Sequence, residues 1–218
     1  MRSLLGFLLL GLALAGCASA TERQDQPPPL GAVKTQSAAQ VMPVGLHIPS
    51  LGIDSIGAWT PLGIQGQNGI PVTPPGKAGE IEVPPVTEPL KLGWYCPRGL
   101  PDCGAPAPGQ VGPAVVLGHV NGNGKPGIFA KLARITKGAE IVIDRNDRSR
   151  VTFAVTKVET PRKADFPTAE VYGDTAKPTL RLITCGGGSN ALEIVGGRRS
   201  YVNQTIVFAD FVSLRPAS

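Results

Sequence analysis

The sequence predicts a mostly β protein built from short strands. The chain has 28 glycines and 22 prolines among 218 residues. Proline breaks helices, and each glycine in a helix interior costs about 1 kcal/mol. Residues 151–158 read VTFAVTKV and place Val151, Phe153 and Val155 on one face of an extended chain. These observations exclude helix bundles, coiled coils and helical repeats.

Each expected strand is a short run rich in apolar or β-branched residues, and turn signals such as Asn121–Gly124 separate the runs. Leu180 and Leu182 lie on one face of their run and Ile183 on the other, which predicts a central strand buried on both sides. The expected strands are Val44–Ile48, Ile53–Ile56, Trp59–Leu62, Ile81–Val83, Ala114–Gly118, Glu140–Asp144, Val151–Val158, Thr179–Cys185 and Thr205–Val212. Short helical turns are expected near Ile128–Ile135 and Thr168–Tyr172. About eight short strands in about 170 residues predict a barrel or sandwich, formed by a single domain over residues 43–218.

The first residues predict a targeting signal. Arg2 precedes the apolar run Leu4–Leu14, which is too short to span a hydrocarbon core of roughly 30 Å but suits a signal peptide. The run ends in Leu14-Ala15-Gly16-Cys17, which resembles a bacterial lipobox. We therefore expect a signal peptide over residues 1–16 and lipidation of Cys17, with the protein held outside the cytoplasm on the cell membrane. The alternative is a plain secretory signal that is cleaved near Ala18–Ala20.

Residues 17–42 predict a flexible tether between the lipid and the domain. The segment is polar and contains the run Pro27-Pro28-Pro29, with little to bury. The formal net charge of the chain is only +5. The sequence contains neither a dense Lys/Arg run nor aromatic residues interleaved with basic ones, and this excludes nucleic acid as a partner.

The four cysteines divide by position. Cys96 and Cys103 flank a short segment with two prolines and a glycine, which is typical of a small disulfide loop in an exported protein. The competing interpretation is half of a metal site, but no second pair of ligands lies nearby in the sequence. With Cys17 assigned to lipid, Cys185 is left over.

Cys185 ends the most hydrophobic run and is followed by Gly186-Gly187-Gly188. Glycines at such a junction allow a substrate backbone to approach closely. An unpaired thiol in an oxidising compartment at this place favours a nucleophile, and the alternative is a buried structural thiol.

A cysteine nucleophile needs a base or an electropositive neighbour, and the chain has only two histidines. His119 directly follows the apolar run Ala114–Gly118. This places it at a strand end, where catalytic residues are often found. His47 lies inside a predicted strand and is interpreted as an ordinary strand position. The order of His119 before Cys185 argues against a papain-like peptidase, in which cysteine precedes histidine.

Taken together, five segments resemble the sortases, the cysteine transpeptidases of bacteria, and most nearly their class F type. The segments are Leu46–Asp54 (LHIPSLGID), Leu92–Tyr95 (LGWY), Ala114–Val120 (AVVLGHV), Leu182–Gly187 (LITCGG) and Val207–Ala209 (VFA). The resemblance covers residues 43 to 212 and implies a closed, eight-stranded β-barrel with short helices. It implies that Cys185 is the nucleophile and His119 the acid/base partner.

The third residue implied by the resemblance is an arginine at the start of the last strand, and here the sequence departs from the family pattern. The position aligned through Tyr201 is Val202. Arg199, with Arg198 as second choice, lies just upstream and is the expected substitute, the alternative being that both are loop arginines in water. A second departure is Asn121, where the family often has aspartate.

The resemblance implies that the chain cleaves a C-terminal LPXTG-like sorting signal of exported proteins through a thioester. The acyl group would then pass to an amine of the cell wall or of a pilin. Neither a metal nor an organic cofactor is implied. Two alternatives remain: an L,D-transpeptidase, disfavoured because Ile183-Thr184 precede Cys185 in place of that family's His-Gly, and a lipid-anchored module that keeps the fold for binding without turnover.

Overall fold

The computed structural model describes residues 40–57, 59–65, 67, 81–187, 192–195 and 198–217. All of these lie in one compact unit, Ala39–Ser218. The predicted signal peptide, the tether up to residue 39 and Cys17 lie outside the described residues. Within the described part of the chain, no helix is long and apolar enough to cross a membrane.

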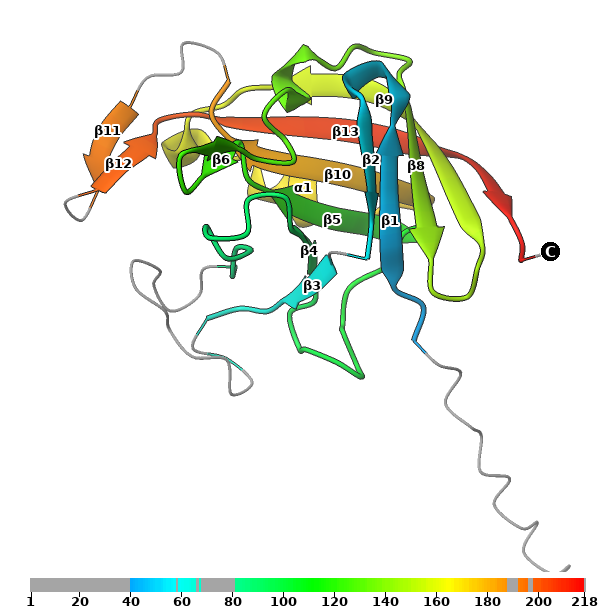
Figure 1. The fold of residues 1–218 in the computed structure, drawn as a ribbon. Helices are drawn as coiled ribbons and strands as arrows, with labels where there is room; N and C mark the ends of the chain where they lie inside the picture. Colours follow the sequence, from blue (N-terminus) through cyan, green and yellow to red (C-terminus); the bar gives the residue numbers. More distant parts are fainter. Residues whose placement is uncertain are drawn as a thin grey trace, which may run out of the picture. The chain divides into compact units, whose positions relative to one another are not determined.

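One curled nine-stranded sheet dominates the unit (Figure 1), in the order β2-β1-β8-β9-β13-β10-β5-β4-β3. Neighbouring strands are antiparallel except for β3 with β4 and β5 with β10, which are parallel. The mostly β prediction is therefore confirmed. The strands are β1 (Pro43–Ile48), β2 (Ile53–Ile56), β3 (Trp59–Leu62), β4 (Leu92–Tyr95), β5 (Gly112–Gly118), β8 (Glu140–Arg145), β9 (Arg150–Glu159), β10 (Pro178–Cys185) and β13 (Gln204–Arg215).

The expectation of a closed eight-stranded barrel is wrong. The sheet curls through 274° and remains an open half-barrel. Closure would require hydrogen bonds between the edge strands β2 and β3. Among the described residues, β3 pairs with β4 along one edge and β2 with β1 along one edge, and β2 and β3 stand at opposite ends of the strand order without pairing with each other. The two short edge strands therefore leave the barrel unsealed.

Smaller elements surround the sheet. Two small ribbons are formed by β6 (Asn121–Gly122) with β7 (Lys125–Pro126), and by β11 (Leu192–Val195) with β12 (Arg198–Tyr201). The helical elements are α1 (Thr168–Tyr172), η1 (Pro49–Leu51), η2 (Leu132–Arg134) and η3 (Lys163–Asp165). The helix at Thr168–Tyr172 is confirmed, whereas the turn expected over Ile128–Ile135 is reduced to η2.

Only one expected strand is nearly absent. Of Ile81–Val83, Ile81 forms a single isolated bridge with Ile64. Two prolines follow at positions 84 and 85. Because proline has no backbone N–H to donate to a neighbouring strand, the pairing cannot continue through them.

The core lies on both faces of β10, as the sequence predicted. Leu180 and Leu182 are fully buried in the larger cluster with Phe153. On the opposite face, Ile183 packs with Val171 of α1 in a second cluster. Central strands buried on two sides are rigid, and β10 therefore holds its carboxyl end, where Cys185 lies, in a fixed place.

The predicted disulfide between Cys96 and Cys103 is confirmed. Both cysteines are buried and pack against Trp94 and Ala107 in a third cluster. The bridge therefore fixes the loop that follows β4.

Candidate active site

Cys185 and His119 come to the same edge of the sheet because their strands are parallel neighbours. In the register of β5 and β10, Leu117 is the partner of Ile183. His119 and Cys185 each lie two residues beyond that pair. Because β5 and β10 are adjacent parallel strands, His119, just past the end of β5, and Cys185, the last residue of β10, both lie at the carboxyl-end edge of this strand pair. Figure 1 shows β5 and β10 running together.

Cys185 is a free cysteine with a partly exposed side chain. The chain turns sharply after it, because the Gly186 N–H donates to the Asn203 carbonyl at 2.8 Å and the Thr205 hydroxyl donates to the Gly186 carbonyl at 2.9 Å. Gly187 has a φ of +99°, and a Cβ there would lie 2.3 Å from the Thr205 hydroxyl oxygen. Glycine at this position is therefore required for the turn beside the thiol.

The ring of His119 is held by a backbone carbonyl. Its Nε2 lies 2.6 Å from the Pro84 carbonyl oxygen, which can only accept, so Nε2 carries the hydrogen. The His119 carbonyl accepts from the Phe129 N–H at 2.9 Å. A Cβ on Gly127 would lie only 2.1 Å from that carbonyl oxygen, so the loop packs directly under His119. With Nε2 occupied, Nδ1 is the nitrogen available for proton exchange.

The residue directly opposite Cys185 is the neutral Gln204. The antiparallel register of β10 and β13 pairs the two residues, and Cβ atoms of such pairs are about 4.5–5.5 Å apart. Val202, the position that the alignment through Tyr201 gives for the arginine, lies two residues before Gln204 in the chain. Sequence reasoning missed Gln204 because the connection between the two strands is long, and only short hairpin turns reveal a register.

The expected arginines lie on the β11–β12 ribbon. The backbone of Arg198 and Arg199 belongs to β12, but their side chains lie outside the described residues. A hydrogen bond of 2.7 Å from the Asn121 amide nitrogen to the Tyr201 hydroxyl connects β12 with the loop after His119. Lys163 donates to the Ser200 hydroxyl at 2.6 Å. The ribbon therefore lies beside the same sheet edge as His119.

A comparison with known families agrees with this arrangement. The family model of the sortase domain matches residues 77–211, which is more than half of the chain. The chain belongs to the sortase family. Sortases are extracytoplasmic transpeptidases, and the family indicates an enzyme of that kind here.

Solved sortase structures share the fold of this sortase. Sortase A from Corynebacterium diphtheriae is 17% identical with a TM-score of 0.52, over 84% of this chain and 66% of that one. Sortase C-1 from Actinomyces oris is 13% identical with a TM-score of 0.51, over 80% and 74%. None of the curated proteins matches the sequence.

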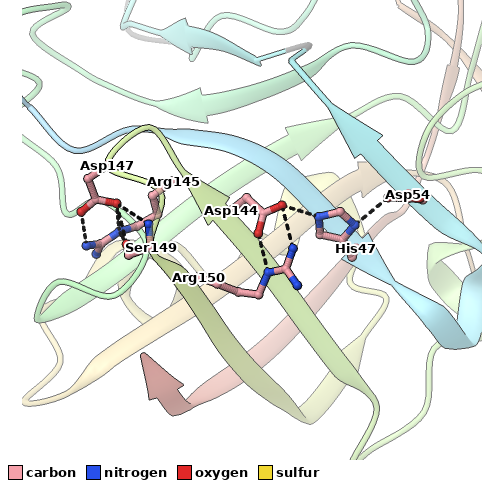
Figure 2. A network of polar contacts seen from close by, with 7 residues as sticks. All are labelled: His47, Asp54, Asp144, Arg145, Asp147, Ser149 and Arg150. Carbon is pink, nitrogen blue, oxygen red and sulfur yellow. Dashed lines mark hydrogen bonds and ion pairs between the residues drawn. The ribbon is translucent and has the colours of Figure 1, made fainter. Parts of the chain in front are cut away.

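The second histidine of this sortase is engaged elsewhere (Figure 2). The His47 ring lies between two carboxylates, with Nδ1 2.6 Å from Asp54 and Nε2 2.7 Å from Asp144. The interpretation of His47 as an ordinary strand position is therefore incomplete, because it joins β2, β1 and β8. Among the described residues, no three His, Cys, Asp or Glu side chains are grouped closely enough to hold a metal ion.

Proposed function

We propose that this sortase is a cysteine transpeptidase in which Cys185 is the nucleophile and His119 the acid/base partner. The observation that supports the proposal most is the parallel register of β5 and β10, which brings the two residues to one edge of the sheet. The proposed substrate is an exported protein with a C-terminal LPXTG-like sorting signal. The proposed acceptor is an amine of the cell envelope, on the cell wall or a pilin.

In the first step, the Cys185 thiolate attacks the carbonyl carbon of a Thr–Gly-like peptide bond. The C–N bond breaks, and His119 as imidazolium gives a proton to the leaving amine. In the second step, neutral His119 removes a proton from the incoming amine as it attacks the thioester. The thiolate is released, and the histidine is again protonated. No oxidant, metal or organic cofactor is needed to balance these steps.

The developing oxyanion needs donors, and the contacts around Cys185 narrow the choice. The Gly186 N–H already donates to Asn203, so it is committed within the protein. The carboxamide of Gln204, directly opposite Cys185, can donate an N–H. Arg199, or Arg198 as second choice, would supply positive charge from β12. Donors of this kind are typically worth a few kcal/mol each in transition-state stabilisation.

We further propose that Cys17 carries a lipid and that residues 17–42 tether the domain to the cell membrane. An anchor would keep the enzyme where exported substrates emerge. Globomycin, which blocks processing of lipoprotein signals, should leave an unprocessed precursor in cells. Normal processing under the drug would contradict the lipid anchor and leave a plain secretory signal.

The transpeptidase is tested with a library of sorting-signal peptides and an amine acceptor. Wild-type protein should form both the cleaved product and the amide product, and Cys185→Ala should form neither while its circular dichroism is unchanged. Normal turnover by Cys185→Ala would overturn the proposal. Wild-type protein that reacts with a thiosulfonate at Cys185 but turns over no peptide would instead indicate a binding module.

The arginine assignment has its own test. Arg199→Ala should lower kcat/KM at least tenfold and Arg198→Ala should do so less. Arg98→Ala, on the exposed disulfide loop, is the matched control. If neither β12 variant loses tenfold, both arginine assignments are wrong.

A further inference from the structure

A polar cavity lies where the turn between β8 and β9 meets the end of β13. Its volume is about 410 Å³, and four of its seven lining residues are arginines. We call it the arginine pocket. Its lining residues are Asp144, Arg145, Arg148, Ser149, Arg150, Arg215 and Pro216. Figure 2 shows Arg145 and Arg150 with the acidic partners that hold them.

Arg145 belongs to the frame of the pocket. Its side chain is 10% exposed and forms an ion pair of 2.6 Å with Asp147. It also donates to the Ser149 hydroxyl at 2.6 Å and to the Pro108 carbonyl at 3.2 Å. The hydrogen bond from Arg145 lowers the pKa of Asp147 to about 2. The charge of Arg145 is therefore compensated within the protein.

Arg150 is only partly committed. It donates to both oxygens of Asp144, from Nε at 2.6 Å and from Nη2 at 3.2 Å. This hydrogen bonding keeps the pKa of Asp144 below its ordinary value. A guanidinium has five N–H donors, and the Arg150 side chain is 47% exposed. Part of its donor edge remains available to a ligand.

Arg148 and Arg215 carry the uncompensated charge. Both are exposed, and neither has an acidic partner among the described residues. Arg215 is the direct cross-strand partner of Arg150, and like charges directly opposite each other destabilise a sheet. An anion between the two would relieve that repulsion.

The turn between β8 and β9 fixes the position of Arg148. Arg148 has a φ of +65°, in the left-handed region that favours glycine or asparagine. The Asp147 carboxylate fixes this turn by accepting from the Ser149 N–H at 3.0 Å. The Arg148 N–H donates to the Arg145 carbonyl at 3.0 Å and the Arg145 N–H to the Ser149 carbonyl at 3.0 Å, the pattern of a three-residue hairpin loop whose last residue is left-handed. The hairpin therefore holds Arg148 at the rim of the cavity.

We propose that the arginine pocket binds a phosphate group. Arginine's planar fork matches phosphate oxygens and forms strong charge-assisted hydrogen bonds with them. The unpaired guanidinium groups of Arg148 and Arg215 line the cavity, together with the N–H groups of Arg150 that Asp144 does not use. The pocket is separate from the Cys185 site, because β13 runs from Gln204 to Arg215, roughly 36 Å at about 3.3 Å per residue.

The place where the chain enters the compact unit indicates a source for the phosphate. Asn146, in the turn that lines the pocket, hydrogen bonds to Met42 at 3.0 Å and to the Gln40 carbonyl at 3.0 Å. Residues 40–42, with which the described chain begins, therefore lie beside the pocket. If Cys17 carries the proposed lipid and residues 17–42 behave as the proposed flexible tether, their root-mean-square span would be about 25–30 Å. Headgroup phosphates of anionic lipids would then be the nearest source.

The binding test uses inorganic pyrophosphate as the probe. The protein is the chain without residues 1–16 and with Cys17→Ser, which keeps the whole compact unit and carries no lipid. Isothermal titration at low salt should show binding that weakens as salt rises. The double variant Arg148→Gly/Arg215→Gln should bind at least tenfold more weakly. Arg134→Gln, an exposed arginine on η2, is the matched control and should bind as wild type does.

Arg148→Gly distinguishes binding from folding. Because glycine relieves the positive φ, this variant should unfold at the same temperature as wild type or higher, while its affinity falls. A second arm uses vesicles of phosphatidylglycerol or of phosphatidylcholine. Retention on phosphatidylglycerol vesicles alone, lost in the double variant, identifies the lipid headgroup as the source.

Binding of pyrophosphate without retention on vesicles identifies a soluble phosphate instead. Wild-type affinity of the double variant for both probes would overturn the phosphate site. Sorting-peptide turnover and globomycin processing are measured separately, so failure of the proposed function or of the anchor is distinguishable from failure of the pocket.

Discussion

The two ends of β13 are built on opposite principles. At the Arg215 end, the carboxylates of Asp147 and Asp144 form ion pairs with Arg145 and Arg150. The positive charges left there belong to arginines, which stay protonated at any physiological pH. At the Gln204 end, the neighbour of Cys185 in the ladder is a neutral amide, and His119 contacts a backbone carbonyl. A histidine that works as acid and base must both gain and lose a proton. A neutral partner is compatible with that cycle.

The two histidines repeat the contrast. His47 faces a carboxylate with each ring nitrogen, and a carboxylate oxygen only accepts. Both contacts are hydrogen bonds only when both ring nitrogens carry hydrogen. His119 has one ring nitrogen committed and the other available. The difference indicates a structural role for His47 and leaves His119 as the candidate for proton transfer.

The largest expected effect is that of His119→Gln, which should lower kcat on a sorting peptide by roughly 10²–10⁴-fold, the range of general acid–base catalysis. His47→Gln is the matched control. It should keep turnover within about threefold and lower the free energy of unfolding by about 1 kcal/mol, since its pairs are partly exposed. Steady-state kinetics and thermal unfolding check both. The reverse pattern would mean that the two histidines have been assigned the wrong way round.

The next effect concerns Gln204, the residue opposite the proposed nucleophile Cys185. Gln204→Ala should lower kcat by about 10–100-fold with a smaller change in KM, because the lost N–H acts mainly on the oxyanion. Gln204→Glu should be worse, since it adds negative charge, whereas Gln204→Arg should restore most of the rate. Activity that is equal in all three variants would remove Gln204 from the mechanism.

A smaller effect is expected at the link between β12 and the loop after His119. Tyr201→Phe removes the hydroxyl that receives the Asn121 hydrogen bond, at a cost of about 1 kcal/mol, or roughly fivefold in kcat/KM. Asn121→Ala should give a similar loss, and the double variant should lose little more than either single variant. Fully additive losses would show that the two side chains act independently.

The smallest effect is at the arginine pocket and depends on pH. Because the folded-state pKa of Asp147 is lowered to about 2, its contribution to stability is present above the unfolded value of about 3.9. That contribution is lost as the pH falls through about 2. Asp147→Asn should therefore be less stable than wild type at neutral pH, and the difference should shrink in acid. A difference that is constant between pH 7 and pH 2 would contradict the Arg145–Asp147 pairing. Asp147→Asn is expected to leave the sorting-peptide activity at neutral pH unchanged.

Much of the fold could be predicted because strands leave a local pattern. The alternation in Val151–Val158 and the two-sided burial of Leu182 and Ile183 identify β9 and β10 within a few residues. Cys185 and His119 could also be proposed from the sequence as the catalytic pair, because each lies at the end of an apolar strand with glycines nearby. The strand β4 was not predicted, since a glycine interrupts the short run Leu92–Tyr95.

The sequence by itself determined the mostly β character, the disulfide between Cys96 and Cys103, and the choice of Cys185 and His119. These features depend on residue type and on neighbours a few positions away. Only the tertiary structure decided that the sheet stays open, that Gln204 faces Cys185, and that Arg150 meets Arg215. Register between distant strands is set by which apolar faces bury together and by hydrogen bonds across long connections, and no local pattern carries that information.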